Sequence, residues 1–374
     1  MDAILILLLL SACFLAYSNG ANDNFKGVAT LFGSGTTNYK KAIIWASVTT
    51  FAGSVAAIFL ANELVKNFSG KGLVPNELLL TPTFAIAIAL GAAITVFIAT
   101  KVGMPISTTH SLVGALFGAG IVAVGSDFNF AKLGKTFLMP LIVSPLMAAV
   151  ASLLLYIIFR HFRKLLGITK NTGIYAEKIK TELATVGTNN QMNIVSKETI
   201  SVTSEHPLET YNGNFMGISS QKILDTLHFI SAGIVSFARG LNDTPKIVGL
   251  LLIIGSLDIK YSMLIIAVVM TIGGLLNAKK VGVNMGKKIT PMNSGQGFTA
   301  NIITGLLVTT ASVHGLPVST THVSVGSIFG IGTVTKKSDK KMITKIIGSW
   351  ILTLPIAALA SALVYITLTQ LFNL

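Results

Sequence analysis

Apolar runs of about twenty residues recur along the chain and alternate with short segments that carry Lys, Gly, Asn and Pro. A helix of about twenty apolar residues crosses the ~30 Å hydrocarbon core of a bilayer and satisfies its own backbone hydrogen bonds there. The pattern therefore predicts ten helical membrane segments. They fall at residues 3–33, 42–62, 83–100, 105–125, 137–159, 223–256, 261–278, 297–313, 317–334 and 346–372.

A polar stretch rich in Asn, Thr, Ser, Lys and Glu separates these segments into two sets of five. We therefore expect a first transmembrane repeat at 1–160, a hydrophilic cytoplasmic loop at 161–221 and a second transmembrane repeat at 222–374. Only 11% of the residues are charged and 52% are hydrophobic, whereas a soluble domain carries about a quarter charged residues. So few charges cannot cover a globular surface, and the sequence predicts an all-α polytopic membrane protein.

Two short motifs occur once in each half of the chain. The sequence GANDNFK at 20–26 matches GLNDTPK at 240–246, and GMPISTTH at 103–110 matches GLPVSTTH at 315–322. Because the motifs keep their order and approximate spacing, they indicate an internal duplication. Each half has an odd number of segments, so the two copies must lie in opposite orientations in the membrane. Inverted repeats of this kind are typical of secondary transporters, whose site lies near the midplane between the repeats.

The net charge of +14 does not indicate nucleic-acid binding, because most Lys and Arg lie in short clusters between apolar segments. Basic residues accumulate in the cytoplasmic loops of membrane proteins. If the central loop, with Arg160, Arg163, Lys164 and Lys170, faces the cytoplasm, most other clusters fall on the same side. We therefore expect a multi-pass protein of the cell (inner) membrane with both termini outside. The other basic residues assigned to the cytoplasmic side are Lys40, Lys41, Lys279, Lys280, Lys287, Lys288, Lys336, Lys337, Lys340 and Lys341.

The amino terminus resembles a lipoprotein cleavage site, with Leu-Ser-Ala-Cys at 10–13 after a leucine run. The two residues before that run are Met and Asp, which give no basic region of the kind a signal peptide carries. We therefore expect the first segment to be retained. The lone Cys13 excludes an intrachain disulfide and a cysteine-based metal cluster.

The Asn-Asp pair of the first motif lies inside apolar sequence in both halves. An Asp at the centre of a membrane helix costs ~2.5–3.5 kcal/mol and is rarely retained without a partner or a function. Flanking Gly20, Gly240 and Pro245 weaken the helix and free backbone carbonyl groups. Carbonyl, amide and carboxylate oxygens together predict a cation site, with sodium as the metal ion at Asp23 and Asp243. The predicted cation-binding residues are Asn22, Asp23, Asn242 and Asp243.

The alternative for these aspartates is a structural ion pair with a lysine. Lys26 and Lys246 each follow their Asp by three residues, which places both side chains on one helix face. Recurrence of the Asn-Asp pair at matching places in the two halves favours the cation site. The roles of both lysines stay open at this point, as does that of Arg239, whose counterpart in the first half is Asn19.

The Pro-x-Ser-Thr-Thr-His motif follows a Gly and opens an apolar segment in each half. Pro suits the first turn of a helix and Ser or Thr suits its cap. We expect each motif to form a re-entrant hairpin that buries a helix amino terminus, whose N–H groups, positive dipole end and hydroxyls bind an anion. Two such ends facing each other would hold a tetrahedral oxyanion. The predicted substrate-binding residues are Ser107, Thr108, Thr109, Ser319, Thr320 and Thr321, together with Asn22 and Asn242.

Simple helix capping is the alternative for these hydroxyls. For His110 and His322, a buried structural role is favoured over direct contact with the site, because no further His or Cys lies at metal-ligand spacing.

The two copies of G-x-N-D and of P-[IV]-S-T-T-H resemble the inorganic phosphate transporter (PiT) family of secondary transporters. The resemblance implies cation–phosphate symport by two inverted-topology repeats of about five membrane segments each, with broken and re-entrant helices. It also implies that the Asn-Asp pairs bind ions and substrate and that the Ser-Thr-Thr runs coordinate phosphate. The chain departs from the family pattern after the first Asn-Asp, where it has Asn24-Phe25-Lys26, so Lys26 is not placed in direct contact with ions or substrate.

We therefore expect a secondary active transporter that imports inorganic phosphate by symport with sodium. Its partners would be phosphate, sodium and membrane lipid, with no cofactor, and a homodimer is left open. Proton coupling or a sulfate permease of the same fold are the alternatives. An intramembrane hydrolase is disfavoured because an enzyme needs one nucleophile and each residue here is duplicated. A passive channel is disfavoured because channels use rings of like sites from several subunits.

Overall fold

The helices of the first half run from Ala3 to Leu165. The computed structural model describes residues 3–173, 176–186, 192–202, 208–252, 257–288 and 292–372. The first half contains α1 (Ala3–Asp23), the 3-10 helix η1 (Asn24–Val28), α2 (Ala29–Gly33), α3 (Tyr39–Leu60), α4 (Asn62–Phe68), α5 (Asn76–Leu79), α6 (Pro82–Val102), α7 (Thr108–Val124), the 3-10 turn η2 (Gly125–Asp127), α8 (Phe130–Lys132), the π-helical stretch η3 (Leu133–Leu138) and α9 (Met139–Leu165).

The second half repeats this order of long helices. It contains α10 (Ser220–Val248), the 3-10 turn η4 (Gly249–Leu251), α11 (Ile259–Asn277), α12 (Lys279–Lys288), α13 (Ser294–Val313), α14 (Thr320–Thr335) and α15 (Lys340–Phe372). By the positions of the two motifs, α10 corresponds to α1, α13 to α6 and α14 to α7.

Seven helical stretches in the described part of the chain are long and apolar enough to cross a membrane, which confirms a multi-pass membrane protein. These seven include α1, α3, α6, α7, α9, α11 and α15. The sequence also placed α10, α13 and α14 in the membrane. They fall outside the seven because α14 has 16 residues and the other two carry more polar residues.

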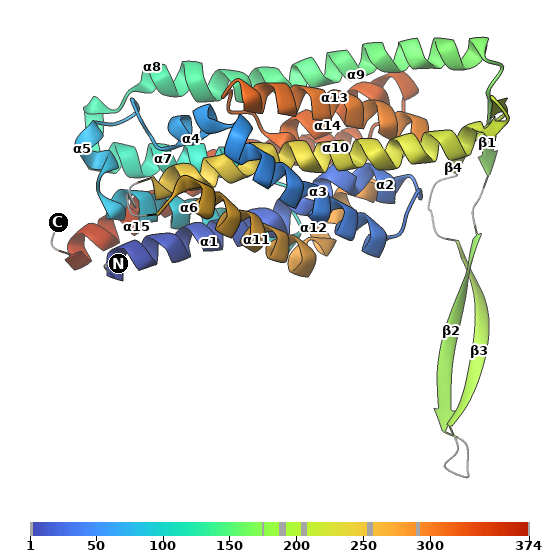
Figure 1. Ribbon diagram of the computed structural model, residues 1–374, viewed down its shortest axis with the longest axis horizontal. Coiled ribbons are helices and arrows are strands. Elements are labelled where there is room, and N and C mark those ends of the chain that lie inside the picture. The colour runs from blue at the N-terminus through green and yellow to red at the C-terminus, as the bar shows by residue number, and fades with distance from the viewer. Residues whose placement is uncertain are drawn as a thin grey trace.

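The central loop forms antiparallel strands, which its polar sequence did not predict. The strand β1 (Thr169–Gly173) pairs with β4 (Leu208–Asn212), β2 (Ala176–Val186) with β3 (Met192–Val202), and β5 (Asn214–Phe215) with β6 (Ile218–Ser219). The β2–β3 ribbon lies apart from the helices, at the end of the bundle opposite to the start of α1 and the end of α15 (Figure 1). We call these the loop end and the terminal end.

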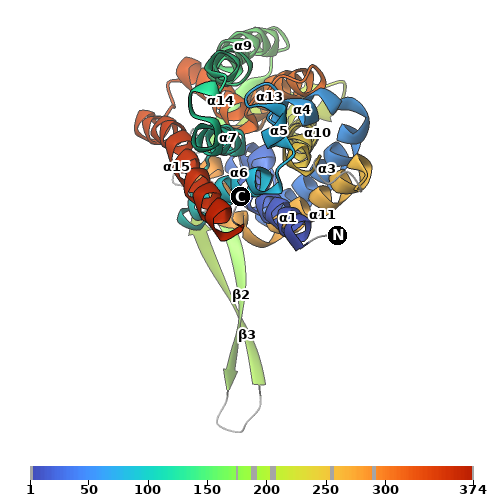
Figure 2. The ribbon, with the colours of Figure 1, turned by 90° about the vertical axis from the view of Figure 1, so that its left-hand side faces the viewer.

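Helices of one half pack against helices of the other half rather than only among themselves. α1 packs on α11 and α10 packs on α3, while α7 packs on α15 and α14 packs on α9. Figure 2, which views the terminal end, shows α15 beside α7 and α1 beside α11. Each contact has its counterpart in the other half, so the repeats are interlocked about a pseudo-twofold axis.

Glycines allow this close approach at matching positions. A Cβ at Gly118 of α7 would lie 2.0 Å from the Ala358 carbonyl oxygen of α15, and one at Gly330 of α14 would lie 2.1 Å from the Ala149 oxygen of α9. Membrane helices commonly pack through small residues in this way. In lipid there is no hydrophobic driving force for helix association, so the helices depend on close van der Waals packing.

The hairpins α6–α7 and α13–α14 insert from opposite ends. Asn293, which caps α13, and Lys337, which follows α14, both donate to Glu209 of the loop, at 2.8 and 2.6 Å. Both outer ends of this hairpin therefore lie at the loop end. α6 and α7 lie toward the terminal end (Figure 1). The predicted inverted repeats with re-entrant helices are thus confirmed.

The α-helix ends at the Asn-Asp pair in the first half but continues past the pair in the second half. α1 ends at Asp23 and continues as a 3-10 helix, as expected. The expected break at Asp243 is wrong, because α10 continues through Pro245 to Val248. Gly240 instead supports packing: its added Cβ would lie 2.0 Å from the Thr50 carbonyl oxygen of α3, and one at Gly20 would lie 1.9 Å from that of Met270 in α11.

Candidate functional site

The two Ser-Thr-Thr-His motifs begin helices that meet inside the bundle. The Thr109 hydroxyl at the start of α7 donates to the Val318 carbonyl oxygen at 3.2 Å, and the Thr321 hydroxyl at the start of α14 donates to the Ile106 oxygen at 3.2 Å. Each helix start is therefore bonded to the segment that precedes the other one. The two helix starts therefore lie together, between the first and the second half of the chain.

The serines of these motifs cap their helices. Ser107 Oγ accepts from the backbone N–H of His110 at 3.1 Å, and Ser319 Oγ accepts from that of His322 at 3.3 Å. The first N–H groups of a helix have no intrahelical acceptor, so Thr108, Thr109, Thr320 and Thr321 still present such groups at the positive helix ends. For Ser107 and Ser319, the structure thus places the side-chain oxygen in a cap.

The two aspartates lie close together next to these helix starts. Asn19 Nδ2 donates to Asp23 Oδ2 at 3.3 Å and lies 3.2 Å from Asp243 Oδ2, so a single amide bridges both carboxylates. Both aspartates are buried. Thr108 Oγ1 also donates to Asp23 Oδ2, at 3.1 Å. This contact joins the predicted anion site directly to the predicted cation site.

Each aspartate has the lysine that follows it as a partner. Lys26 Nζ donates to Asp23 Oδ1 at 2.5 Å, to the Ile106 carbonyl oxygen at 2.5 Å and to Thr321 Oγ1 at 2.8 Å. Lys246 Nζ donates to the Val318 oxygen and to Thr109 Oγ1, both at 2.7 Å, and lies 3.5 Å from Asp243 Oδ1. Lys26, which the sequence did not place in direct contact with ions or substrate, thus contacts two predicted site residues, Asp23 and Thr321. The Asp–Lys ion pairs considered from the sequence are present in both halves.

Arg239 breaks the symmetry of this cluster. Its NH2 group donates to Asn19 Oδ1 at 2.7 Å, and its Nε lies 3.6 Å from Asp243 Oδ2. Asn19 and Arg239 are sequence counterparts, so they meet across the pseudo-twofold axis. Among the described residues, the charged side chains that are fully buried are Asp23, Asp243, Lys26, Lys246 and Arg239. Three cations against two anions leave one positive charge if all five carry their ordinary charges.

The asparagines of the motifs hold the hairpin segments in place. Asn22 Nδ2 donates to Thr100 Oγ1 at 2.9 Å, and Asn22 Oδ1 accepts from the Ile106 N–H at 3.2 Å. Asn242 Oδ1 accepts from Ser312 Oγ at 3.1 Å, and its Nδ2 donates to the Val318 oxygen at 3.2 Å. Both side chains therefore lie beside the predicted site, but each is bonded to the hairpin of its own half.

Comparison with known proteins decides the family. The sequence model of the phosphate transporter family matches residues 6–361. The chain belongs to this family. Its members are transporters and not enzymes, so the hydrolase alternative is excluded.

Individual relatives agree with this assignment over nearly their full length. Proteins named as phosphate permeases of Pyrococcus abyssi and Haemophilus influenzae are 26% and 28% identical, covering 98% and 96% of this chain and 98% and 95% of the relatives. The solved structure of a sodium-dependent phosphate transporter superposes with a TM-score of 0.77 at 23% identity. It covers 99% of this chain and 100% of the other, and this likeness confirms the fold.

The two motif histidines of this phosphate transporter contact each other with their rings tilted by 39°. The rings of His110 and His322 lie 4.3 Å apart between centroids, and Trp350 stacks on His322 at 3.7 Å. His322 Nδ1 lies 3.4 Å from the Leu141 carbonyl oxygen. Neither ring touches the aspartates among the described contacts, which is consistent with the structural role favoured from the sequence.

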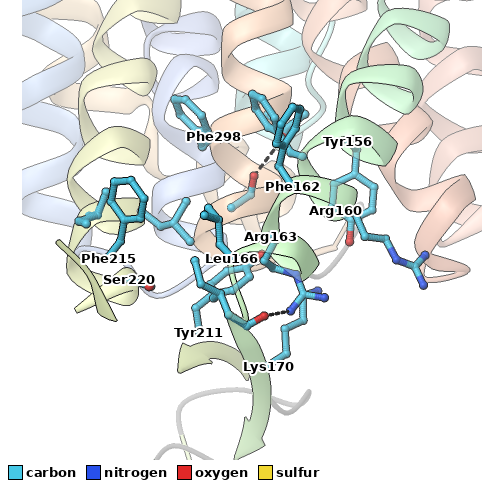
Figure 3. Close-up of a pocket in the computed structure, with 16 residues that line it drawn as sticks. Tyr156, Arg160, Phe162, Arg163, Leu166, Lys170, Tyr211, Phe215, Ser220 and Phe298 are labelled. Carbon is cyan, nitrogen blue, oxygen red and sulfur yellow. Dashed lines mark hydrogen bonds between the residues drawn. The ribbon is translucent and has the colours of Figure 1, made fainter. Parts of the chain in front are cut away.

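The transporter also has a cavity that is separate from this site. Figure 3 shows it at the loop end, where aromatic side chains of α9 and α13 lie above the basic residues that begin the central loop. Its volume is about 260 Å³, and Tyr156, Phe162 and Phe298 contribute to its wall. None of the predicted site residues lines this cavity.

Proposed function

We propose that this transporter imports inorganic phosphate together with sodium ions by alternating access at the site between the inverted repeats. The observation that supports this best is the meeting of the α7 and α14 starts beside two buried aspartates. Backbone N–H groups of the helix starts serve as donors to the anion, and threonine hydroxyls join them by turning away from the carbonyl and carboxylate oxygens that they bond in this structure. Carboxylates serve as ligands to the cation. The proposed phosphate-binding residues are Ser107, Thr108, Thr109, Ser319, Thr320 and Thr321, with Asn22 and Asn242 beside them.

The charge of the buried cluster supports an anionic substrate. Three buried cations face two buried carboxylates, so one negative charge is missing from the cluster. A monovalent phosphate would neutralise it, and a divalent phosphate would do so together with one cation. Since uncompensated charge inside a membrane protein is costly, this balance supports an anionic substrate and leaves room for one cation beside a divalent phosphate.

The aspartates favour phosphate over sulfate. Near neutral pH phosphate carries a proton, and a carboxylate such as Asp23 accepts a hydrogen bond from it. Sulfate has no proton to donate, and its lone pairs repel the carboxylate. Sites built around a buried polar group reject an analogue without the matching donor by up to ~10⁴-fold. We expect arsenate to compete with labelled phosphate uptake and sulfate not to compete. Equal inhibition by both would instead indicate a sulfate permease.

For the coupling ion, we propose sodium bound at Asp23 and Asp243. The site has many oxygen atoms within reach, and a protein of the same fold is named as sodium-dependent. A proton needs only a carboxylate, which makes proton coupling the second candidate. The test is phosphate uptake into proteoliposomes at fixed pH, with and without an inward sodium gradient. Uptake that follows the sodium gradient is expected, and uptake that follows only a pH gradient would contradict sodium coupling.

We also propose that the loop end faces the cytoplasm and both termini face outside, as the distribution of Lys and Arg favours. Met216 at the loop end and Leu80 at the terminal end are exposed. Single Met216→Cys and Leu80→Cys variants in a Cys13→Ser background should react with an impermeant thiol reagent from opposite sides of the cell membrane. Labelling of Met216→Cys in intact cells would show that the loop end faces outside, which is the opposite orientation.

A further inference from the structure

The lysine ammonium groups contact the predicted cation site and the predicted phosphate site at the same time. Lys26 Nζ bonds Asp23 Oδ1 on one side and Thr321 Oγ1 on the other. Lys246 Nζ lies between Asp243 Oδ1 and Thr109 Oγ1 in the same way. Each ammonium therefore connects the carboxylate of its own half with the helix start of the opposite half.

Oxygen atoms surround each ammonium in the manner of a bound cation. An ammonium has three N–H donors, and Lys26 uses them on a carboxylate, a backbone carbonyl and a hydroxyl. Lys246 has the same three kinds of oxygen around it. Carboxylate, carbonyl and hydroxyl oxygens are also the ligands that hard cations prefer. A sodium ion at Asp23 or Asp243 must therefore compete with an ammonium for the same oxygens.

On the basis of the proposed function, we propose that Lys26 is an exchangeable tethered cation that couples sodium binding to phosphate binding. When sodium occupies the Asp23 position, the ammonium leaves the carboxylate and remains next to Thr321, where it binds the phosphate. When sodium is absent, Asp23 holds the ammonium and the phosphate loses this partner. Each ligand thereby strengthens the binding of the other, as reciprocal coupling requires.

The two lysines differ in how closely they hold their aspartates. Lys26 lies 2.5 Å from Asp23, whereas Lys246 lies 3.5 Å from Asp243, which also has Arg239 at 3.6 Å. Removal of Lys26 leaves Asp23 with only neutral hydrogen-bond partners, whereas removal of Lys246 leaves Asp243 with a guanidinium nearby. We therefore expect Lys26 to carry the larger share of the coupling.

The test compares Lys26→Met, Lys246→Met and wild-type protein in detergent, with Lys40→Met as the matched control because Lys40 is exposed in the same half. Phosphate Kd is measured with and without sodium, and the ratio of the two values reports the coupling. Typical coupling is about 5- to 150-fold. We expect the wild-type and Lys40→Met ratios to lie in this range, that of Lys26→Met to fall to about one, and that of Lys246→Met to lie between.

Thermal unfolding gives a second measurement that does not need phosphate. A ligand that binds only the folded state raises its stability in proportion to the logarithm of its concentration. Sodium should raise the Tm of Lys26→Met more than that of wild type, because the variant has an unpaired carboxylate and no competing ammonium. An unchanged Kd ratio with an unchanged sodium effect on Tm would overturn this inference alone. Failure of the wild type to bind phosphate would overturn the proposed function and the inference with it.

Discussion

Asp23 and Asp243 occupy matching positions in the two repeats but have different partners. Asp23 receives hydrogen bonds from Lys26 at 2.5 Å and from Thr108 at 3.1 Å. Asp243 has its lysine at 3.5 Å, receives a hydrogen bond from Asn242 at 3.1 Å and lies 3.6 Å from Arg239. The duplicated backbone thus places both carboxylates at matching positions. Asn19 and Arg239 are counterparts in the two halves but differ in charge, so the two carboxylates have different charged neighbours. The local loss of symmetry at Asn19 and Arg239 makes the two aspartates distinct.

The largest effect is expected where the repeats are alike. Gly20→Ala and Gly240→Ala would each place a Cβ about 2 Å from a backbone carbonyl oxygen of the opposing helix, a distance that real contacts do not reach. The helices must then separate at the site, so little folded protein should be recovered from detergent extracts. Gly348→Ala is the control, because nothing lies within 4 Å of its added Cβ. Normal recovery and uptake by both variants would refute the close contacts.

The next effect is expected at the aspartates. Asp23→Asn should abolish concentrative phosphate uptake and lower stability, because it leaves the buried Lys26 ammonium without its carboxylate, at a cost of about 3–5 kcal/mol. Adding Lys26→Met should restore the Tm but not the uptake. Asp243→Asn should also abolish uptake, and Lys246→Met should restore its Tm only in part because Arg239 remains. Sodium-driven uptake at the wild-type rate in either single variant would make that aspartate structural.

Smaller changes are expected at the helix starts. Thr108→Val and Thr320→Val each remove one hydroxyl at near-constant volume. The Thr108 hydroxyl must turn from Asp23 to the anion when phosphate binds, so its loss, like that of the Thr320 hydroxyl, leaves a phosphate oxygen without its donor at a cost of about 1–3 kcal/mol. Phosphate Kd should rise about ten- to hundredfold in both. Thr108→Val should have the larger effect on sodium, because only Thr108 of these two donates to an aspartate among the described contacts. Isothermal titration measures both ligands, and unchanged phosphate affinity in both variants would assign the hydroxyls to capping.

The smallest effect is expected at the loop end, where Glu209 accepts from Lys170, Lys337 and Asn293 at 2.6–2.8 Å. Burial alone would raise the pKa of Glu209, but the hydrogen bonds from Lys170 and Lys337 lower it to about 2. A lowered folded-state pKa means that the carboxylate stabilises the protein above its ordinary pKa of 4.5 and loses this contribution as the pH falls toward 2.

Glu209→Gln should therefore reduce the free energy of unfolding by about 1–3 kcal/mol at pH 7 and by progressively less between pH 4.5 and 2. Thermal unfolding as a function of pH measures this difference. Glu77→Gln, at an exposed position of the terminal end, should show no such dependence. A pH-independent difference between Glu209→Gln and wild type would show that charge at this position does not stabilise the loop end.

Much of the fold could be predicted from local sequence, because membrane segments need long apolar runs and re-entrant helix starts need Gly, Pro and a cap. The motifs also predicted which residues lie together in the bundle, since a buried Asp repeated in two halves is costly without a role. The contact of Thr109 with Val318 could not be predicted, because it joins residues 209 positions apart. Lys26 was left out of the predicted site because it departs from the family pattern. The Asp-x-x-Lys spacing in both halves nevertheless indicated that each lysine contacts its aspartate. The continuation of α10 through Pro245 was not predicted either; α10 packs on α3, and such tertiary contacts override local propensity.

The interlocked packing of the repeats has a consequence for how the protein is made. α7 packs on α15, which is synthesised later, and the glycine face of α7 that contacts α15 stays uncovered until that helix is made. A chain that stops after α9 would also lack α14, the helix that packs on α9. Synthesis of the first half alone should therefore yield a membrane-inserted but incompletely packed intermediate, open to proteolysis. Two separately expressed halves should regain protection from proteases only when they are present in the same membrane.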